Sequence, residues 1–253
     1  MFDSLKSIFS KSEISDSVFV ENIKVDMHSH LLPGIDDGVK SIEESIEIIR
    51  HFIGLGYKKI ITTPHIMKGT YDNTSEIIKD KLQIIRQEIQ NLNLDMEIEA
   101  SAEYYLDTHF LDLLFNGDIL SFGKENYVLV EFSYLQKQND YQNIFMNISQ
   151  TDYQPILAHP ERYAYFYDKN LSQLKQIKEQ GVLFQLNLFS VLGIYGKDAK
   201  MVAEQLIKEN MIDFVGTDIH KPKHTIYLDD CLKDKYIQQL LKSDKLKNSS
   251  LLS

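Results

Sequence analysis

Residues 24–38 read KVDMHSHLLPGIDDG, and this stretch decides how the rest of the chain is interpreted. It begins as a short apolar strand and ends in closely spaced histidines and acids, among them His28, His30 and Asp37. Residues two apart in a strand point the same way, so His28 and His30 are placed to bind one ligand. Imidazole mixed with carboxylate suits Mn, Fe or Zn in a hydrolytic site. The stretch therefore predicts a metal site at the end of a first strand.

Short apolar runs alternate along the chain with segments of helical periodicity. The expected strands are 24–28, 58–63, 96–102, 126–132, 154–158, 182–188 and 212–217. The expected helices are 41–55, 74–92, 107–115, 141–150, 171–180, 197–210 and 228–243. This alternation predicts a parallel α/β fold, either a closed or nearly closed barrel or an open doubly wound sheet. In both folds the carboxyl ends of the strands meet on one face, where active sites are built.

Six of the seven expected strands end in candidate metal ligands. Beyond the first run, these are His65, Glu103, Glu131, His159 and the pair Asp218 and His220. A single histidine or acid at a strand end is usually a helix cap or a satisfied polar group. Five histidines and four acids at such positions, without a thiol among them, instead predict one shared metal cluster that forms when the strand ends meet.

Composition and charge exclude several classes of protein. The 253 residues carry a formal charge of −10, which argues against a nucleic-acid-binding protein with a broad basic face. The one cysteine, Cys231, excludes an internal disulfide, and Ile237 stands where a Cys-x5-Arg phosphatase would have its arginine. The chain has no P-loop motif, no secretory start and no run long enough to span a membrane. We therefore expect a cytoplasmic protein.

Three segments are expected along the chain. Residues 1–20 form an amphipathic N-terminal extension, which we expect to be a helix that docks on its own domain. Residues 21–245 form a single catalytic domain, because no Pro/Gly-rich linker interrupts them. Residues 246–253 are expected to be a frayed tail.

The ordered motifs of the chain resemble those of the PHP family (polymerase and histidinol phosphatase). They read DMHSHLLPGIDDG, TPH, AEYY, VEFS, AHPERY and TDIH, and extend from about Lys24 to His220. Within the family they are most similar to the metal-dependent protein-tyrosine phosphatases of bacterial capsule and exopolysaccharide loci. The resemblance implies a distorted seven-stranded (β/α)7 barrel, with the metal site at the C-terminal ends of the strands.

The resemblance also implies a role for each candidate residue. It implies three divalent ions, with Mn²⁺ as the first choice and Fe or Zn as alternatives. The implied ligands form three groups, which are His28, His30, Glu103 and Asp218, then Asp37, His65 and His220, and then Glu131 and His159 with Glu103 as a bridge. Arg162 matches the arginine that grips the phosphate, and Arg162, Asp37 and His220 form the implied catalytic set.

The implied activity is hydrolysis of phosphotyrosine by attack of a metal-activated hydroxide on phosphorus. The implied partner is a phosphotyrosine-containing protein, a membrane-associated tyrosine autokinase that controls capsular or exopolysaccharide synthesis. Three divalent ions would more than offset the four carboxylates among the ligands, so an acidic protein could still present a positive pocket to a phosphate. Oligomeric state and the identity of the kinase are left open by the sequence.

Two departures from the family pattern leave alternatives open. The second motif reads TPHI where TPHH is expected, and KPKHTIY follows TDIH where the relatives place an Asn and an Arg. Lys221, Lys223 or His224 could supply the missing cation. The competing functions are another PHP phosphoesterase acting on histidinol phosphate or a nucleotide, an amidohydrolase-type metal hydrolase, and a non-catalytic binding module.

Overall fold

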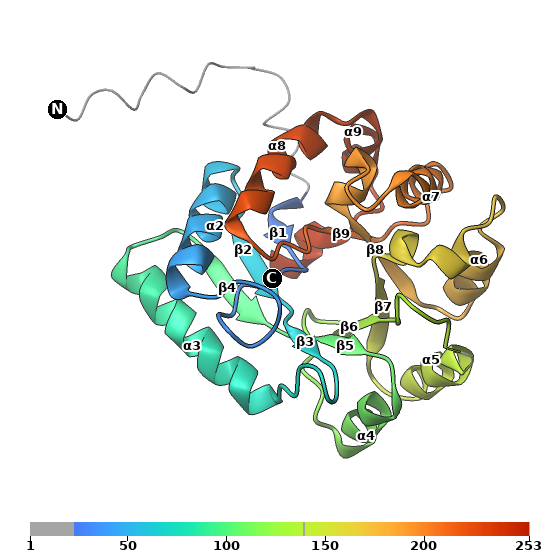
Figure 1. The fold of residues 1–253 in the computed structure, drawn as a ribbon, viewed down its shortest axis with the longest axis horizontal. Coiled ribbons are helices and arrows are strands. Elements are labelled where there is room, and N and C mark those ends of the chain that lie inside the picture. Colours follow the sequence, from blue (N-terminus) through green and yellow to red (C-terminus); the bar gives the residue numbers. More distant parts are fainter. Residues whose placement is uncertain (1–22, 139, 253) are drawn as a thin grey trace.

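The computed structural model describes residues 23–138 and 140–252, so the expected N-terminal extension lies outside the described residues. These residues form a group of parallel strands with helices arranged around the outside (Figure 1). The strands are β1 (Val25–Asp26), β2 (Lys59–Thr62), β3 (His65–Ile66), β4 (Glu97–Ala100), β5 (Glu103–Tyr105), β6 (Tyr127–Glu131), β7 (Gln154–Ala158), β8 (Leu183–Asn187) and β9 (Phe214–Gly216). The α-helices are α2 (Ile42–Gly54), α3 (Ser75–Asn91), α4 (Thr108–Asn116), α5 (Tyr141–Ser149), α6 (Ser172–Glu179), α7 (Lys197–Lys208), α8 (Ile226–Lys233) and α9 (Lys235–Leu241). Short 3-10 helices are η1 (Pro160–Arg162), η2 (Ala164–Phe166), η3 (Leu188–Leu192), η4 (Pro222–Thr225) and η5 (Asn248–Leu252).

The strands form two parallel sheets, which confirms the predicted parallel α/β fold. One sheet has the order β1-β2-β4 and the other the order β3-β5-β6-β7-β8-β9. A single continuous sheet was expected, but the second and third expected strands, which are β2 and β4, are each followed, after two intervening residues, by a further short strand, β3 or β5, that lies in the other sheet. Pro64 separates β2 from β3, and it has no N–H to donate to a ladder. Single hydrogen bonds still cross this break, from Ser101 N–H to the Thr62 carbonyl and from Glu103 N–H to the Pro64 carbonyl.

The first and last strands come together beyond their ends. Ser29 and Ile219 form an isolated parallel bridge, with hydrogen bonds from Asp218 N–H to the His28 carbonyl and from His30 N–H to the Ile219 carbonyl. Below the bridge, the Asp26 carboxylate accepts hydrogen bonds from the backbone and the hydroxyl of Thr217. We call this contact between the β1 and β9 segments the seam. Along part of the seam, the buried Asp26 side chain therefore accepts a backbone hydrogen bond that a carbonyl would accept in a regular β-ladder.

The C-terminal residues are ordered where a frayed tail was expected. Residues 248–252 form η5, in which Asn248 and Leu251 are buried. The Asn248 side chain donates to the carbonyls of Val25 and Val215 and accepts from Val215 N–H. Asn248 thus supplies hydrogen bonds to both strands of the seam, which is why this part of the tail is held in place.

Two apolar clusters pack on opposite faces of the strands. Ile60 and Val128 belong to the larger cluster, whereas their neighbours Ile61 and Leu129 belong to the smaller one. Successive side chains of a strand point to opposite faces, so this alternation identifies strands that are buried on both sides. The larger cluster includes the apolar faces of the helices. The smaller one draws mainly on the strands and is completed by Phe122 and Leu251.

The helices follow the predicted pattern with one exception. The helix expected at 228–243 is divided into α8 and α9. Asp234 lies between them with extended backbone dihedrals, and its side chain accepts from the N–H groups of Tyr236 and Ile237. An aspartate that caps a new helix in this way ends the preceding one. Among the described residues, no helix combines the length and the apolar character needed to cross a membrane.

Candidate metal centre

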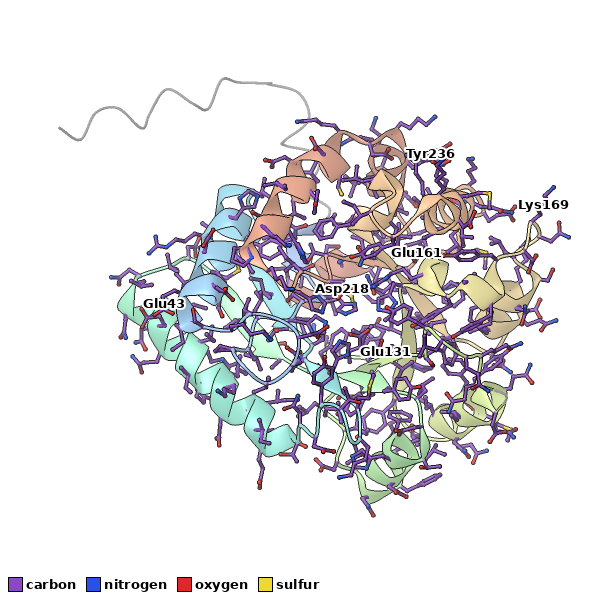
Figure 2. The ribbon with its side chains drawn as sticks, in the orientation of Figure 1. Glu43, Glu131, Glu161, Lys169, Asp218 and Tyr236 are labelled. Atoms are coloured by element: carbon purple, nitrogen blue, oxygen red, sulfur yellow. The ribbon has the colours of Figure 1, made fainter. Side chains whose placement is uncertain are left out.

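All nine candidate ligands of the sequence analysis lie close together at one end of the strands. Most of them come from a strand end or from the residues directly after it. Figure 2 shows Glu131 and Asp218 toward the middle of the molecule, whereas Glu43 and Lys169 lie near its edge. Eight of the nine ligands form three overlapping groups, and His159 contacts Glu103, which belongs to two of these groups.

The first group surrounds His28 and His30. Nε2 of His28 lies 3.1 Å from Glu103 Oε2 and 3.4 Å from Asp218 Oδ1. Nε2 of His30 lies 3.3 Å from the same two oxygens. All four residues are buried, and the ligand atoms lie within 4.8 Å of one another. This is the set that the family resemblance implied for one ion.

The second group lies at the more open side of the site. Asp37 Oδ1 is 3.5 Å from Nε2 of His65 and 3.5 Å from Nε2 of His220. The structure adds His30 to these three residues, since its ligand atom lies within the same 4.8 Å range. Asp37 has a side chain that is 53% exposed, so this group faces solvent.

The third group contains Glu131, Glu103 and His65. His65 Nδ1 lies 3.0 Å from Glu131 Oε1, although the family resemblance implied His65 only for the second ion. His159 joins through its Nε2, which lies 2.9 Å from Glu103 Oε1. Glu103 therefore contacts residues of the first and third groups with its two different oxygens, as a bridging carboxylate does.

Two contact atoms of the third group support a fit to a cation. His65 Nδ1 and Glu131 Oε1 are both buried and have no hydrogen-bond partner among the described residues. They lie 3.0 Å apart without hydrogen-bond geometry. Buried polar atoms are normally paired. Two unpaired ligand atoms that lie side by side suit a shared ion.

The rings of three histidines are fixed through their Nδ1 atoms. His28 Nδ1 hydrogen-bonds to Gln185 Oε1 at 2.9 Å, and His30 Nδ1 to Asp36 Oδ2 at 2.8 Å. His220 Nδ1 donates to the Asp218 carbonyl at 2.8 Å. Metal-binding histidines usually have such a partner, because it fixes the tautomer and leaves Nε2 free for the ion. Gln185 and Asp36 are therefore functional residues that the predicted ligand set did not contain.

Two glycines leave the space that these histidines occupy. A Cβ on Gly216 would lie 2.7 Å from the Cβ of His28 and 2.9 Å from Gln185 Nε2. A Cβ on Gly38 would lie 2.4 Å from the His30 carbonyl oxygen. Real Cβ atoms are not found so close to other atoms. Both positions therefore require glycine for the site to form as observed.

Two ligands have a left-handed backbone. His159 has a φ of 34° and Asp218 a φ of 52°. This conformation is unfavourable for residues with a Cβ and is often found at functional sites. The turn at His159 leads directly into η1, which carries Arg162.

Histidines and carboxylates in the site shift one another's pKa values. Burial alone would raise the pKa of Asp218, but His28 and then His220 hold it well below the ordinary value. Burial and the charge of Glu103 raise the pKa of Glu131. Burial would lower the pKa of His65, but Glu103 and Glu131 raise it to about 9. Protonated histidines thus offset the carboxylates, and a metal ion must displace these protons to bind.

Arg162 lies in the same site, as the family resemblance implied. Its Nη1 donates to Asp218 Oδ2 at 2.5 Å, so Asp218 contacts the arginine with one oxygen and the histidines with the other. The guanidinium lies between two aromatic rings, 4.0 Å from the centre of Tyr195 and 4.9 Å from that of Tyr134. These contacts fix its position over the metal ligands.

A buried network positions Asp218 and Tyr195. Asn187 Nδ2 donates to Asp218 Oδ2 at 3.0 Å and to the Tyr195 hydroxyl at 3.1 Å. Glu161 accepts from Asn187 N–H and from the Ser190 hydroxyl. Glu161 directly precedes Arg162 in η1. This short helix therefore carries both the arginine and the acid that accepts a hydrogen bond from Asn187.

The cations suggested as substitutes for a second arginine are not found at the ligands. The side chains of Lys221 and Lys223 are exposed, and neither forms an ion pair with the nine ligands among the described residues. The ring of His224 lies beside those of Phe189 and Tyr227, with centroids 6.5 and 6.3 Å away. Burial and the neighbouring positive charges, His220 first, lower the pKa of His224. The structure therefore identifies Arg162 as the cation in direct contact with the ligand groups.

The sequence matches one known family over nearly the whole described chain. The model of the family described as "Capsular polysaccharide synthesis, CpsB/CapC" matches residues 24–249. This chain belongs to the CpsB/CapC family. The resemblance to the proteins of capsule loci that was inferred from the motifs is thereby confirmed.

Several proteins similar to this chain are named tyrosine-protein phosphatases. YwqE of Bacillus subtilis is 29% identical over 199 residues, which cover 79% of this chain and 78% of that protein. CpsB of Streptococcus agalactiae is 27% identical over 201 residues, which cover 78% and 82%. CapC of Staphylococcus aureus, named a putative tyrosine-protein phosphatase, is 27% identical over 223 residues, which cover 88% and 84%.

Solved structures agree with this relationship. One, described as YwqE from Bacillus subtilis and CpsB from Streptococcus pneumoniae, "unique metal-dependent tyrosine phosphatases", superposes with a TM-score of 0.74 and 25% identity. The match covers 88% of this chain and 94% of that one. A histidinol phosphate phosphatase from Lactococcus lactis superposes with a TM-score of 0.50 at 14% identity, which shows a similar fold alone.

Proposed function

We propose that this chain is a metal-dependent protein-tyrosine phosphatase that hydrolyses phosphotyrosine. The observation that carries the proposal is the convergence of nine nitrogen- and oxygen-bearing side chains with Arg162, in a member of the CpsB/CapC family. Relatives in that family are named tyrosine-protein phosphatases. A cysteine mechanism is not supported, because Cys231 is buried against the Leu188 carbonyl and burial raises the pKa of its thiol.

We assign three divalent ions to the site, with Mn²⁺ as the first choice and Fe or Zn as alternatives. Histidine and carboxylate ligands accept all three metals, so the choice rests on availability as well as on geometry. The proposed ligand sets are His28, His30, Glu103 and Asp218 for the first ion, Asp37, His65 and His220 for the second, and Glu131 and His159, with Glu103 as a bridge, for the third. Contacts of 2.9 to 3.5 Å support the assignment of His28, His159 and His220, and Glu131 lies within 4.8 Å of Glu103.

The protein's own residues would bind and orient the phosphate. Arg162 is fixed by Asp218 and by two aromatic rings, so its remaining N–H groups can hold phosphate oxygens without rearrangement. Asp37 and His220 form the solvent-facing side of the site and complete the proposed catalytic set. Bound divalent ions would neutralise charge on the phosphate and lower the pKa of water, which supplies the nucleophile.

We further propose that the two sheets together form a distorted, seven-stranded barrel. Joining β2 to β3 and β4 to β5 gives seven strands in chain order, and the seam between β1 and β9 would close them. The small apolar cluster of strand residues would then fill the interior. On this view residues 21–245 form one catalytic domain, because two of the three ligand groups combine residues from both ends of the chain and the third shares Glu103 with one of them.

The proposed substrate is a phosphotyrosine-containing protein, and we suggest a membrane-associated tyrosine autokinase that controls capsular or exopolysaccharide synthesis. Membership of a capsular polysaccharide synthesis family supports this choice. We propose a cytoplasmic location, which fits a single cysteine that is free and buried.

The test removes one carboxylate charge at the site and one at the surface. The purified protein is stripped with chelator, supplied with Mn, Fe or Zn, and assayed for phosphate release from a phosphotyrosine peptide. Phosphoserine peptide and histidinol phosphate serve as comparison substrates. Glu131→Gln is expected to lower turnover by more than about 100-fold, beyond the loss typical of an outer-shell partner. Glu43→Gln, an exposed acid at the edge of the molecule (Figure 2), should leave turnover unchanged.

Three outcomes separate the possible functions. Metal-restored release from phosphotyrosine that is lost in Glu131→Gln and kept in Glu43→Gln supports the proposal. Release from histidinol phosphate alone would keep the metal site but refute the tyrosine phosphatase function. No phosphate release from any substrate with any of the three metals would refute a phosphatase function altogether.

A further inference from the structure

Tyr134 lies at the edge of the proposed active site, three residues after the ligand Glu131. Its hydroxyl is 3.2 Å from Nδ1 of His159, and the two rings stack with centroids 5.7 Å apart and 24° between their planes. The same ring lies 4.9 Å from the guanidinium carbon of Arg162. Tyr134 is nevertheless 41% exposed. Its ring therefore contacts both a metal ligand and the phosphate-binding arginine while it also faces solvent.

The segment that leads to Tyr134 is held firmly. The Tyr163 hydroxyl accepts from Phe132 N–H at 3.0 Å, and the Tyr165 hydroxyl donates to the Ser133 carbonyl at 2.7 Å. The Tyr163 ring lies 5.3 Å from the Tyr134 ring and stacks on Tyr165 at 5.8 Å. The position of Tyr134 is thus set by hydrogen bonds on two sides and by a row of aromatic rings.

An open cavity lies beside this segment. It has a volume of about 360 Å³ and is lined by Tyr105, Asp107, Ser133, Gln136, Lys137 and Gln138. Ser133 links it to Tyr134, and Tyr105 pairs in register with the ligand Glu131. The adjoining Leu135 is 97% exposed, although it is a large apolar residue. A peptide that enters the site here would meet an aromatic ring, an apolar side chain and a polar cavity.

We propose that Tyr134 selects aryl phosphate esters, because its exposed ring receives the phenyl ring of the substrate phosphotyrosine. The adjoining residues of the peptide would then lie toward the cavity beside Ser133. This inference rests on the proposed phosphatase function and names the residue that gives it preference for tyrosine. A phosphate held by Arg162 would place its ester group beside Tyr134, because the ring and the guanidinium are 4.9 Å apart. Aromatic rings attract one another at centroid distances of 4.5–7 Å, whereas an alkyl ester has no ring to offer.

The experiment compares an aryl with an alkyl phosphate in the metal-loaded protein. The substrates are phenyl phosphate, a phosphotyrosine peptide and the same peptide with phosphoserine. Tyr134→Ala should raise KM for both aryl substrates by roughly 3- to 10-fold more than KM for the phosphoserine peptide, because only the aryl substrates lose an aromatic pair. Tyr134→Phe keeps the ring and should keep the preference for aryl over alkyl substrates. Phe115→Ala removes a 67% exposed ring on α4 and serves as the matched surface control.

Other results would overturn the inference. An equal loss on aryl and alkyl substrates in Tyr134→Ala would mean that Tyr134 positions Arg162 or His159 instead of the substrate ring. If Tyr134→Phe lost the preference for aryl substrates as fully as Tyr134→Ala, the hydroxyl and not the ring would be responsible for it. Unchanged KM in Tyr134→Ala would exclude any role in selection. Phosphotyrosine hydrolysis by the unaltered protein, measured in the same assay, tests the proposed function separately.

Discussion

Gly216→Ala is expected to displace a metal ligand. Gly216 ends β9, and a Cβ there would lie 2.7 Å from the Cβ of His28 and 2.9 Å from Gln185 Nε2. Carbon atoms in contact normally lie about 3.5–4.0 Å apart, so His28 must move by about 1 Å. Metal–ligand distances tolerate only about 0.2 Å. The added methyl group therefore exceeds the tolerance of the proposed first ion several-fold.

Two measurable effects follow from this displacement. Metal affinity should fall about 10- to 100-fold, the loss typical when the support of a ligand is disturbed, which equals about 1.4–2.8 kcal/mol. The free energy of unfolding of the metal-free protein should also fall by about 1–3 kcal/mol, because the core is overpacked. The φ angle of Gly216 is not positive, so alanine can adopt its backbone conformation and the effect is steric.

Chelator competition measures the first effect, and chemical denaturation of the metal-free protein measures the second. Gly54→Ala is the matched control, because a Cβ on Gly54 would meet no atom within 4 Å. Gly54 is the last residue of α2, where alanine should be neutral or stabilise by up to about 1 kcal/mol. If Gly216→Ala bound metal as tightly as the unaltered protein, the argument that His28 is fixed by the close approach of β9 would be refuted.

Other changes test different contacts of the site and the fold. Asp36→Asn removes the charge that orients His30 at 2.8 Å, so chelator competition should show metal affinity lowered about 10- to 100-fold; equal affinity would contradict this role. Burial would lower the pKa of His65, but carboxylates, Glu103 first, raise it from 6.5 to about 9. Stability from this proton is therefore complete below pH 6.5 and lost toward pH 9, so the metal-free protein should melt at lower temperature across that range; a constant melting temperature would exclude this linkage. Asn248→Ala leaves three buried backbone groups of the seam unpaired, so denaturant titration should show a loss of about 2–4 kcal/mol; a loss under about 0.5 kcal/mol would be typical of a frayed tail instead.

The positions of most candidate ligands could be predicted because parallel strands bring their ends together. His65, Glu103 and Glu131 lie within or at the ends of strands that run parallel, so they had to reach one face of the sheets. Arg162 was implied by the family resemblance of the AHPERY motif, and it lies one short turn after His159. These residues are identifiable in a sequence because both the local strand pattern and the ligand chemistry point to them.

The residues that hydrogen-bond to the ligand histidines were harder to predict from the sequence. Gln185 lies in the apolar run of β8 and has no ligand spacing of its own, although a glutamine inside such a run is a signal of a buried polar contact. Asp36 precedes a ligand in a turn, where an aspartate is ordinary. Their roles depend on which histidine lies opposite, and that is a property of the tertiary structure.

Three features of the fold differ from the prediction for related reasons. Pro64 removes a ladder hydrogen bond at one point, yet the neighbouring residues keep the strand pattern, so periodicity could not show the division into two sheets. Asp234 was read as part of a continuous helix, although aspartate is a common N-cap. The tail has a polar composition, but Asn248 and Leu251 are buried because the seam and the small apolar cluster need them.

The residues that join the first and last strands are also those that carry metal ligands. Asp218 N–H donates to the His28 carbonyl at 2.7 Å, and His30 N–H donates to the Ile219 carbonyl at 3.0 Å. Segments about 190 residues apart must meet before these bonds form, which costs loop-closure entropy. Asp218 then reaches the histidines and Arg162, so the ligand group exists only when the seam has formed. Because an ion that binds only the assembled group stabilises it by mass action, the metal is expected to support the fold as well as the chemistry.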